Sequence, residues 1–137
     1  MVSGARRGRA VAVALVLLAA AAGVVAAEDL EARVEKAEAA AKANAATTEG
    51  REWIRRNSAA SAKLLMPVLN KCLPDDGDIP TVFAVYVRLS DKGRVQEALT
   101  ELDADLGACL TSGAAATKFA APPRDGYWIQ LNMAADL

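Results

Sequence analysis

Two cysteines are the residues of this chain best suited to chemistry. Cys72 and Cys109 lie far apart in the sequence and do not form the C-x-x-C spacing of thiol–disulfide oxidoreductases. A structural disulfide between them therefore fits better than a redox-active pair, which is the alternative. Closing a loop of this length stabilises a fold by roughly 3–4 kcal/mol in the chain-entropy model, a large share of a small domain's stability.

Other reactive constellations are missing from the sequence. The chain contains no histidine, the commonest general base and a frequent metal ligand. We find no Gly-rich phosphate loop, nucleophile elbow or zinc-ligand spacing. Asp75, Asp76 and Asp78 resemble a calcium loop only in part, because the EF-hand spacing and its terminal glutamate are absent. We expect a solvated turn there, and no enzymatic activity, metal site or cofactor.

Residues 1–27 have the layout of a secretory signal peptide. Arg6, Arg7 and Arg9 precede an apolar run over residues 10–25, and small residues close the segment. This pattern predicts cleavage and export to the periplasm, where disulfides persist. An uncleaved inner-membrane anchor is the alternative, because the run approaches the length of roughly 17–25 residues that spans a bilayer. A membrane contact is expected only in that case.

The charge of the chain argues against nucleic acid as a partner. The 16 basic and 17 acidic residues nearly balance, and cleavage of the predicted signal peptide removes basic residues only. The mature protein is then mildly acidic, whereas nucleic-acid-binding proteins carry basic patches. We therefore do not expect a nucleic-acid partner.

Residues 28–59 form an Ala-, Glu- and Lys-rich segment that should be helical. Its apolar stripe has helical spacing but consists mostly of alanine: Leu30, Val34, Ala37, Ala41 and Ala45. Alanine gains little from burial, so a solvated, partly frayed helix is expected rather than a coiled coil or stalk. Trp53 and Ile54 follow among arginines, and we expect them to anchor the segment on the next domain, with a contact surface as the alternative.

Residues 60–137 are expected to form the folded domain. Residues 61–73 read as an amphipathic helix with Cys72 on its apolar face, and Pro67 should kink or restart it. In residues 81–89 every second side chain is apolar, and the side chains between them include both apolar and polar types, as in a half-buried strand. A turn with positive φ at Gly93 leads into a less regular return strand, which a bulge would reconcile with the pattern.

A second helix and a last strand complete the domain. The helix has an apolar stripe that turns Cys109 inward beside Leu110, so the disulfide would tie helix to helix; Asp103 or Asp105 would cap it. Residues 127–133 alternate again, with Tyr127, Ile129, Leu131 and Met133 on one face and Trp128, Gln130 and Asn132 on the other. Chain-terminal strands often lie at a sheet edge, where they can accept a partner strand.

These elements predict an α+β fold. We expect a small three-stranded antiparallel sheet with two helices packed on one face, preceded by an N-terminal Ala-rich helix.

The order of motifs resembles the periplasmic C-terminal domain of TonB-type energy transducers, and most of all its cysteine-containing gliding-protein version. The matching features cover about residues 60–135: the helix with Cys72, the strand, Asp91-Lys92-Gly93-Arg94-Val95, the helix with Cys109-Leu110, Phe119, Pro122-Pro123 and the last strand. In that family the final strand takes up an extended peptide of an outer-membrane receptor. The resemblance implies that the partner is a periplasmic or outer-membrane protein. It also implies docking at residues Tyr127, Trp128, Ile129, Gln130, Leu131 and Asn132.

Three functions follow as expectations. The first is an exported module that docks a partner segment at its sheet edge. The second is a short membrane-anchored accessory of an energy transducer. The family's proline-rich spacer has no counterpart before Pro67, which argues against force transduction. The third is a structural or inhibitor domain of the cell envelope.

Overall fold

The computed structural model describes residues 29–73, 82–102 and 104–134 of the 137-residue chain. The predicted signal peptide, the aspartate-rich turn and Asp103 as a helix cap lie outside these residues. None of the helices within them is long and apolar enough to cross a membrane.

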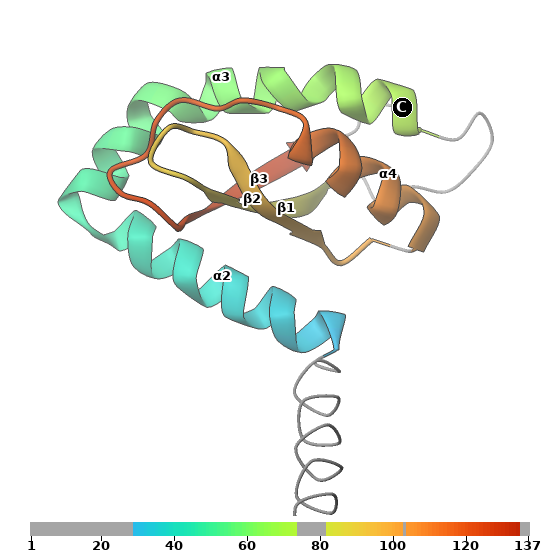
Figure 1. Cartoon of the computed structure of the whole chain (residues 1–137), viewed down its shortest axis with the longest axis horizontal. Coiled ribbons are helices and arrows are strands. Elements are labelled where there is room, and N and C mark those ends of the chain that lie inside the picture. Colours follow the sequence, from blue (N-terminus) through green and yellow to red (C-terminus); the bar gives the residue numbers. More distant parts are fainter. Residues whose placement is uncertain (1–28, 74–81, 103, 135–137) are drawn as a thin grey trace, which may run out of the picture.

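The described residues form an α+β fold of three helices and three strands (Figure 1). Their order is α2 (Leu30–Ala46), α3 (Thr48–Cys72), β1 (Val82–Leu89), β2 (Val95–Thr100), α4 (Ala104–Ala115) and β3 (Tyr127–Ala134). The strands pair antiparallel in the order β2-β1-β3, so the last strand is an edge strand. The predicted fold class and the edge position of the last strand are confirmed.

One face of the sheet carries the main hydrophobic core. The alternating apolar residues of β1 and β3 are buried there: Phe83, Val85, Val87, Leu89, Tyr127, Ile129, Leu131 and Met133. Helices α3 and α4 cover this face (Figure 1), with Leu65 and Leu69 of α3 and Leu110 of α4 in the same cluster. The predicted alternation and the two helices on one face are both confirmed.

The turn between β1 and β2 has a conformation that requires glycine at position 93. Gly93 has a φ of 83°, and a Cβ at this position would overlap the main chain of Phe119, so both conformation and space require glycine. The Phe119 amide donates to the Gly93 carbonyl over 2.9 Å. The predicted bulge is present as a register shift between Arg88 and Leu89.

The disulfide joins α3 to α4. Cys72 and Cys109 are bonded, with their Cα atoms 5.7 Å apart, which confirms the predicted pairing. Cys109 was expected to point inward, and this is wrong: it is exposed, because Leu110 and Ala114 occupy the core-facing side of α4. Helix α3 continues unbroken past Pro67 to Cys72, so the boundary expected between residues 59 and 60 falls inside this helix.

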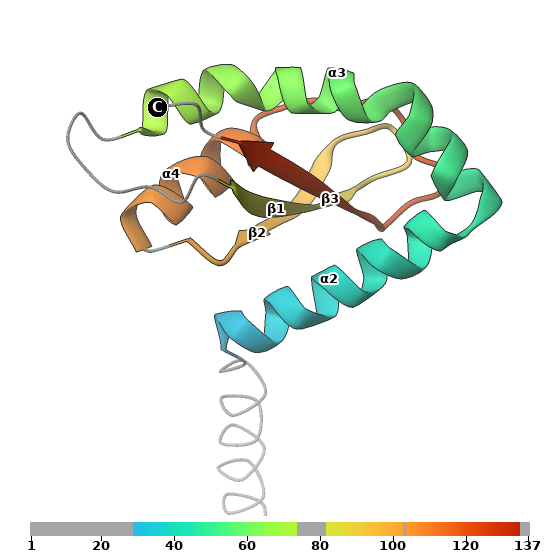
Figure 2. The ribbon, with the colours of Figure 1, turned by 180° about the vertical axis from the view of Figure 1, so that it is seen from behind.

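The N-terminal Ala-rich helix is not solvated and frayed, contrary to the prediction. Helix α2 packs on the second face of the sheet, opposite α3 and α4 (Figures 1 and 2). Val34 and Ala37 are each only 1% exposed and cluster with Tyr86 and Leu99. Small side chains let the helix lie close to the sheet, where large residues supply the buried area that alanine lacks. The hydroxyl of Tyr86 also donates to Glu38 over 3.1 Å.

Candidate docking groove

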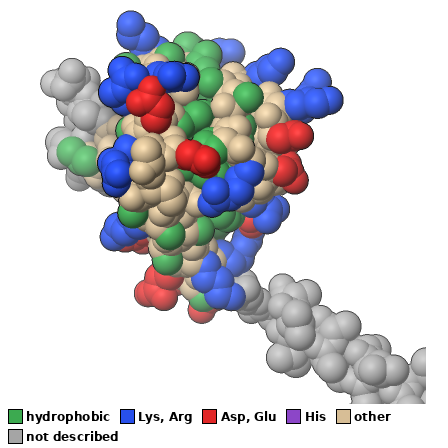
Figure 3. All heavy atoms as spheres, turned by 90° about the vertical axis from the view of Figure 1, so that its left-hand side faces the viewer, with side chains coloured by type: hydrophobic (Ala, Val, Ile, Leu, Met, Phe, Trp, Pro, Cys, Tyr) green, Lys and Arg blue, Asp and Glu red, His purple; other side chains and the backbone are tan. Residues whose placement is uncertain are grey.

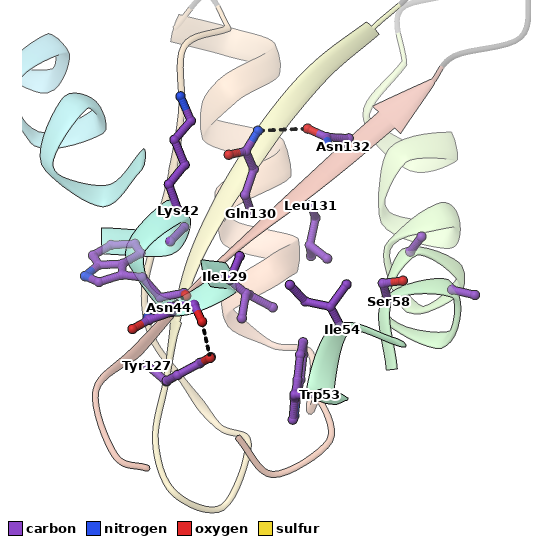
Figure 4. Close-up of a pocket in the computed structure, with 15 residues that line it drawn as sticks. Lys42, Asn44, Trp53, Ile54, Ser58, Tyr127, Ile129, Gln130, Leu131 and Asn132 are labelled. Atoms are coloured by element: carbon purple, nitrogen blue, oxygen red, sulfur yellow. Dashed lines mark hydrogen bonds between the residues drawn. The ribbon is translucent and has the colours of Figure 1, made fainter. Parts of the chain in front are cut away.

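A groove of about 540 Å³ runs along the outer edge of β3. Helices α2 and α3 form its two walls, and residues 127–132 of β3 form its floor (Figure 4). Figure 2 shows β3 lying between the two helices in the same way. All six residues predicted from the family resemblance as partner-binding therefore lie together in one concave surface.

A one-residue corner between the helices creates this groove. Thr47 ends α2 and caps α3, because its hydroxyl oxygen accepts from the Gly50 amide over 2.9 Å. Gly50 is required here, since a Cβ would overlap the Asn44 carbonyl. Arg51 donates to the Ala46 carbonyl over 2.8 Å, which caps the end of α2. Lys and Arg side chains are prominent on the end of the molecule that includes this corner (Figure 3).

The outer edge of β3 presents main-chain groups to the groove. Along an antiparallel strand, successive residues direct their N–H and C=O groups alternately toward the paired strand and away from it. Trp128 faces outward, because its carbonyl accepts a 3.0 Å hydrogen bond from the Asn44 side chain on α2. The period of two places the amide and carbonyl groups of Gln130 and Asn132 on the same side. Within the described part of the chain, no protein group pairs with them there.

The α3 wall is apolar. Trp53 is buried, its ring nitrogen donates to the Ala121 carbonyl over 2.9 Å, and its ring lies 6.5 Å from that of Tyr127. The predicted anchoring role of Trp53 is confirmed. The side chain of its neighbour Ile54 remains 38% exposed and lies in the groove together with Ser58 (Figure 4).

The α2 wall is more polar. Lys42 bonds Glu38 over 2.6 Å, and this hydrogen bond, followed by the one from Tyr86, lowers the pKa of the Glu38 carboxyl. Asn44 also accepts a 2.8 Å hydrogen bond from Arg124 at its side-chain oxygen. The Tyr127 hydroxyl donates to the Asn44 carbonyl over 3.4 Å, and burial raises the pKa of this phenol.

The groove has the chemistry of a binding surface. It offers a free main-chain edge, an apolar wall and a polar wall with one cation. The part of the chain that the structure describes contains no group of three acidic, cysteine or histidine residues able to hold a metal ion. Comparisons with protein-family models, with curated proteins and with solved structures found no match.

Sequence reasoning missed the α2 wall entirely. Lys42 and Asn44 stand in an unremarkable Ala-rich helix, and no local pattern places Asn44 beside a residue of the last strand. The one available signal was the stripe through Val34, Ala37 and Ala41, which is continuous over the buried part of α2.

Proposed function

We propose that this protein is an exported interaction module that docks an extended segment of a periplasmic or outer-membrane protein at the free edge of β3. The observation that carries the proposal is the pair of outward-facing main-chain positions, Gln130 and Asn132, on the floor of a groove. An added strand would satisfy these groups by the hydrogen bonds of β-augmentation.

The flanking helices support docking of one segment rather than open-ended association. Exposed edge strands invite uncontrolled pairing, and proteins protect them by covering the edge. Here α2 and α3 stand on either side of β3, which favours a single extended segment over a second sheet.

Two independent features support the proposed compartment. The disulfide between Cys72 and Cys109 supports an oxidising environment. The composition of residues 1–27 supports export, and hence the periplasm. A membrane-anchored accessory is the second candidate, favoured by the apolar run at residues 10–25. The mass of the exported protein distinguishes them, because a chain that starts at Glu28 excludes the anchor.

Removal of one outward amide tests the docking proposal. Proline at position 130 eliminates the Gln130 N–H that faces the groove and leaves the pairing of β3 with β1 in place. Position 129 is unsuitable, because the N–H of Ile129 points toward β1 and its side chain is buried. The matched control is Gln130→Ala, which removes the same side chain and keeps the N–H.

The readout is a crosslinking pull-down from native envelope extract. We expect the wild type and Gln130→Ala to recover the same partner, and Gln130→Pro to recover roughly tenfold less, corresponding to about 1.4 kcal/mol. Circular dichroism and urea unfolding establish that Gln130→Pro is folded. Undiminished recovery by folded Gln130→Pro contradicts docking at this edge.

A further inference from the structure

We infer that the docked segment has alternating chemistry: apolar side chains toward α3 and a carboxylate toward Lys42. This inference rests on the proposed function, because it describes the segment that β3 accepts. It follows from the different character of the two walls and from the geometry of strand pairing.

Strand pairing assigns each docked side chain to a wall. Residues directly opposite each other in neighbouring strands project from the same face of the sheet. Positions of the segment opposite Ile129 and Leu131 therefore turn toward α3. Positions opposite Gln130 and Asn132 turn toward α2. In Figure 4, Gln130 and Lys42 lie on one side of β3, whereas Leu131 and Ile54 lie on the other.

The α3 side suits apolar side chains. Ile54 keeps 38% of its surface exposed although it lies in the groove. On the C-terminal side of Ile54 this wall consists of the small residues Ser58, Ala59 and Ala62, which leave room beside Ile129 and Leu131. An apolar side chain placed there removes the exposed face of Ile54 from water.

The α2 side suits a carboxylate. Lys42 is the only charged residue among the described residues that line the groove, and its side chain is 68% exposed. Its present partner, Glu38, also accepts a hydrogen bond from Tyr86, so Glu38 stays bonded when Lys42 turns to a second carboxylate. Ala41 and Ala45 beside it are too small to obstruct that approach. A basic side chain at the same position would place a second cation beside Lys42.

Asn44 fixes the register of the docked segment. Its side-chain amide already donates a hydrogen bond to the carbonyl of Trp128, which the main-chain amide of a docked strand would otherwise do. The segment therefore starts its pairing at Gln130, and the side chain opposite Gln130, which strand pairing turns toward α2, is the first to reach Lys42.

The test uses three short synthetic peptides with a fluorescent label and the mature chain. The first alternates valine with glutamate, the second alternates valine with lysine, and the third has the composition of the first in two blocks. Fluorescence anisotropy should show the valine–glutamate peptide binding at least roughly tenfold more tightly than either of the others. Added salt should weaken this binding.

Charge reversal on the protein makes the test specific. Lys42→Glu should reverse the preference between the glutamate and lysine peptides. Lys71→Glu is the matched control, because Lys71 is exposed at the far end of α3, and it should leave the preference unchanged.

The peptide results test the inference and leave the proposed function to its own experiment. Equal binding of the alternating peptides, equal binding of the block peptide, or a preference that Lys42→Glu leaves intact overturns the inference. Absence of binding by all three peptides overturns it as well. In each of these cases the docking proposal stands or falls separately, on recovery of the native partner by Gln130→Ala and its loss in Gln130→Pro.

Discussion

The side-chain amide of Asn44 donates a 3.0 Å hydrogen bond to the carbonyl of Trp128, 84 residues further along the chain. The carboxamide oxygen of Asn44 accepts from Arg124 over 2.8 Å. One side chain near the end of α2 thus holds both the edge strand and the loop that leads into it. The helix that covers the second face of the sheet also controls how much of the β3 edge is free.

Asn44→Ala should lower the free energy of unfolding by about 1 kcal/mol. The substitution leaves the Trp128 carbonyl without its donor and breaks the contact to Arg124, and a lost hydrogen bond of this kind costs about 0.5–1.5 kcal/mol. Urea unfolding measures the change. Asn70→Ala is the control, since Asn70 is exposed on α3, and it should stay within about 0.5 kcal/mol of the wild type. Equal stability of both variants would refute the role assigned to Asn44.

Loss of the disulfide should cost about 4 kcal/mol. Cys72 and Cys109 are separated by 37 positions, and the chain-entropy relation gives this value for a loop of that length. The double variant Cys72→Ser/Cys109→Ser and the reduced wild type should share one urea midpoint, well below that of the oxidised wild type. A reductant should shift the wild type and leave the double variant unaffected. A reductant-insensitive wild type would show that the bond is absent in solution.

Gly113→Ala should destabilise the protein even though alanine favours helices. A Cβ at Gly113 would overlap the Cγ1 atom of Val68 on α3. Overpacking of this kind costs about 1–3 kcal/mol, more than the roughly 1 kcal/mol that alanine gains over glycine in a helix. In a Val68→Ala background the obstruction is gone, so the same change should become stabilising. A double-mutant cycle by urea unfolding measures the coupling, and strictly additive effects would contradict the close approach.

Stability should fall at alkaline pH through Tyr86. Burial, followed by the hydrogen bond to Glu38, raises the pKa of Tyr86 from 10.0 to about 12. The folded protein therefore retains the phenolic proton at pH values where the unfolded chain has lost it. This contribution to the free energy of unfolding is complete below a pH of about 10 and is lost as the pH rises to about 12. Tyr86→Phe should flatten the decline in urea midpoint over that window; an unaltered slope would rule out this assignment.

The first face of the sheet was predictable because its signals are local. Phe83, Val85 and Val87 alternate within one strand, and that period alone assigns a buried face. Gly93 stands where the turn needs positive φ. The two cysteines restrict their own pairing, since the described chain offers no other thiol.

The second face was not predictable because burial of alanine depends on the surface opposite it. Ala37 carries little apolar area, and its partners Tyr86 and Leu99 lie far away in the sequence. The positions of β1 and β3 whose side chains lie on this second face also include Arg88 and Gln130, and such polar residues are typical of a solvated face. Arg88 instead lies over the ring of Trp128, with 5.7 Å between the guanidinium carbon and the ring centroid.

The position of β3 imposes an order on folding. This strand begins at Tyr127, yet the helices that flank it precede residue 73. Until residues 127–134 are available, the sheet lacks its β3 edge, and α2 and α3 lack one of their packing partners. Contacts between segments so distant form slowly, so the export proposed above would carry a chain whose sheet is still incomplete.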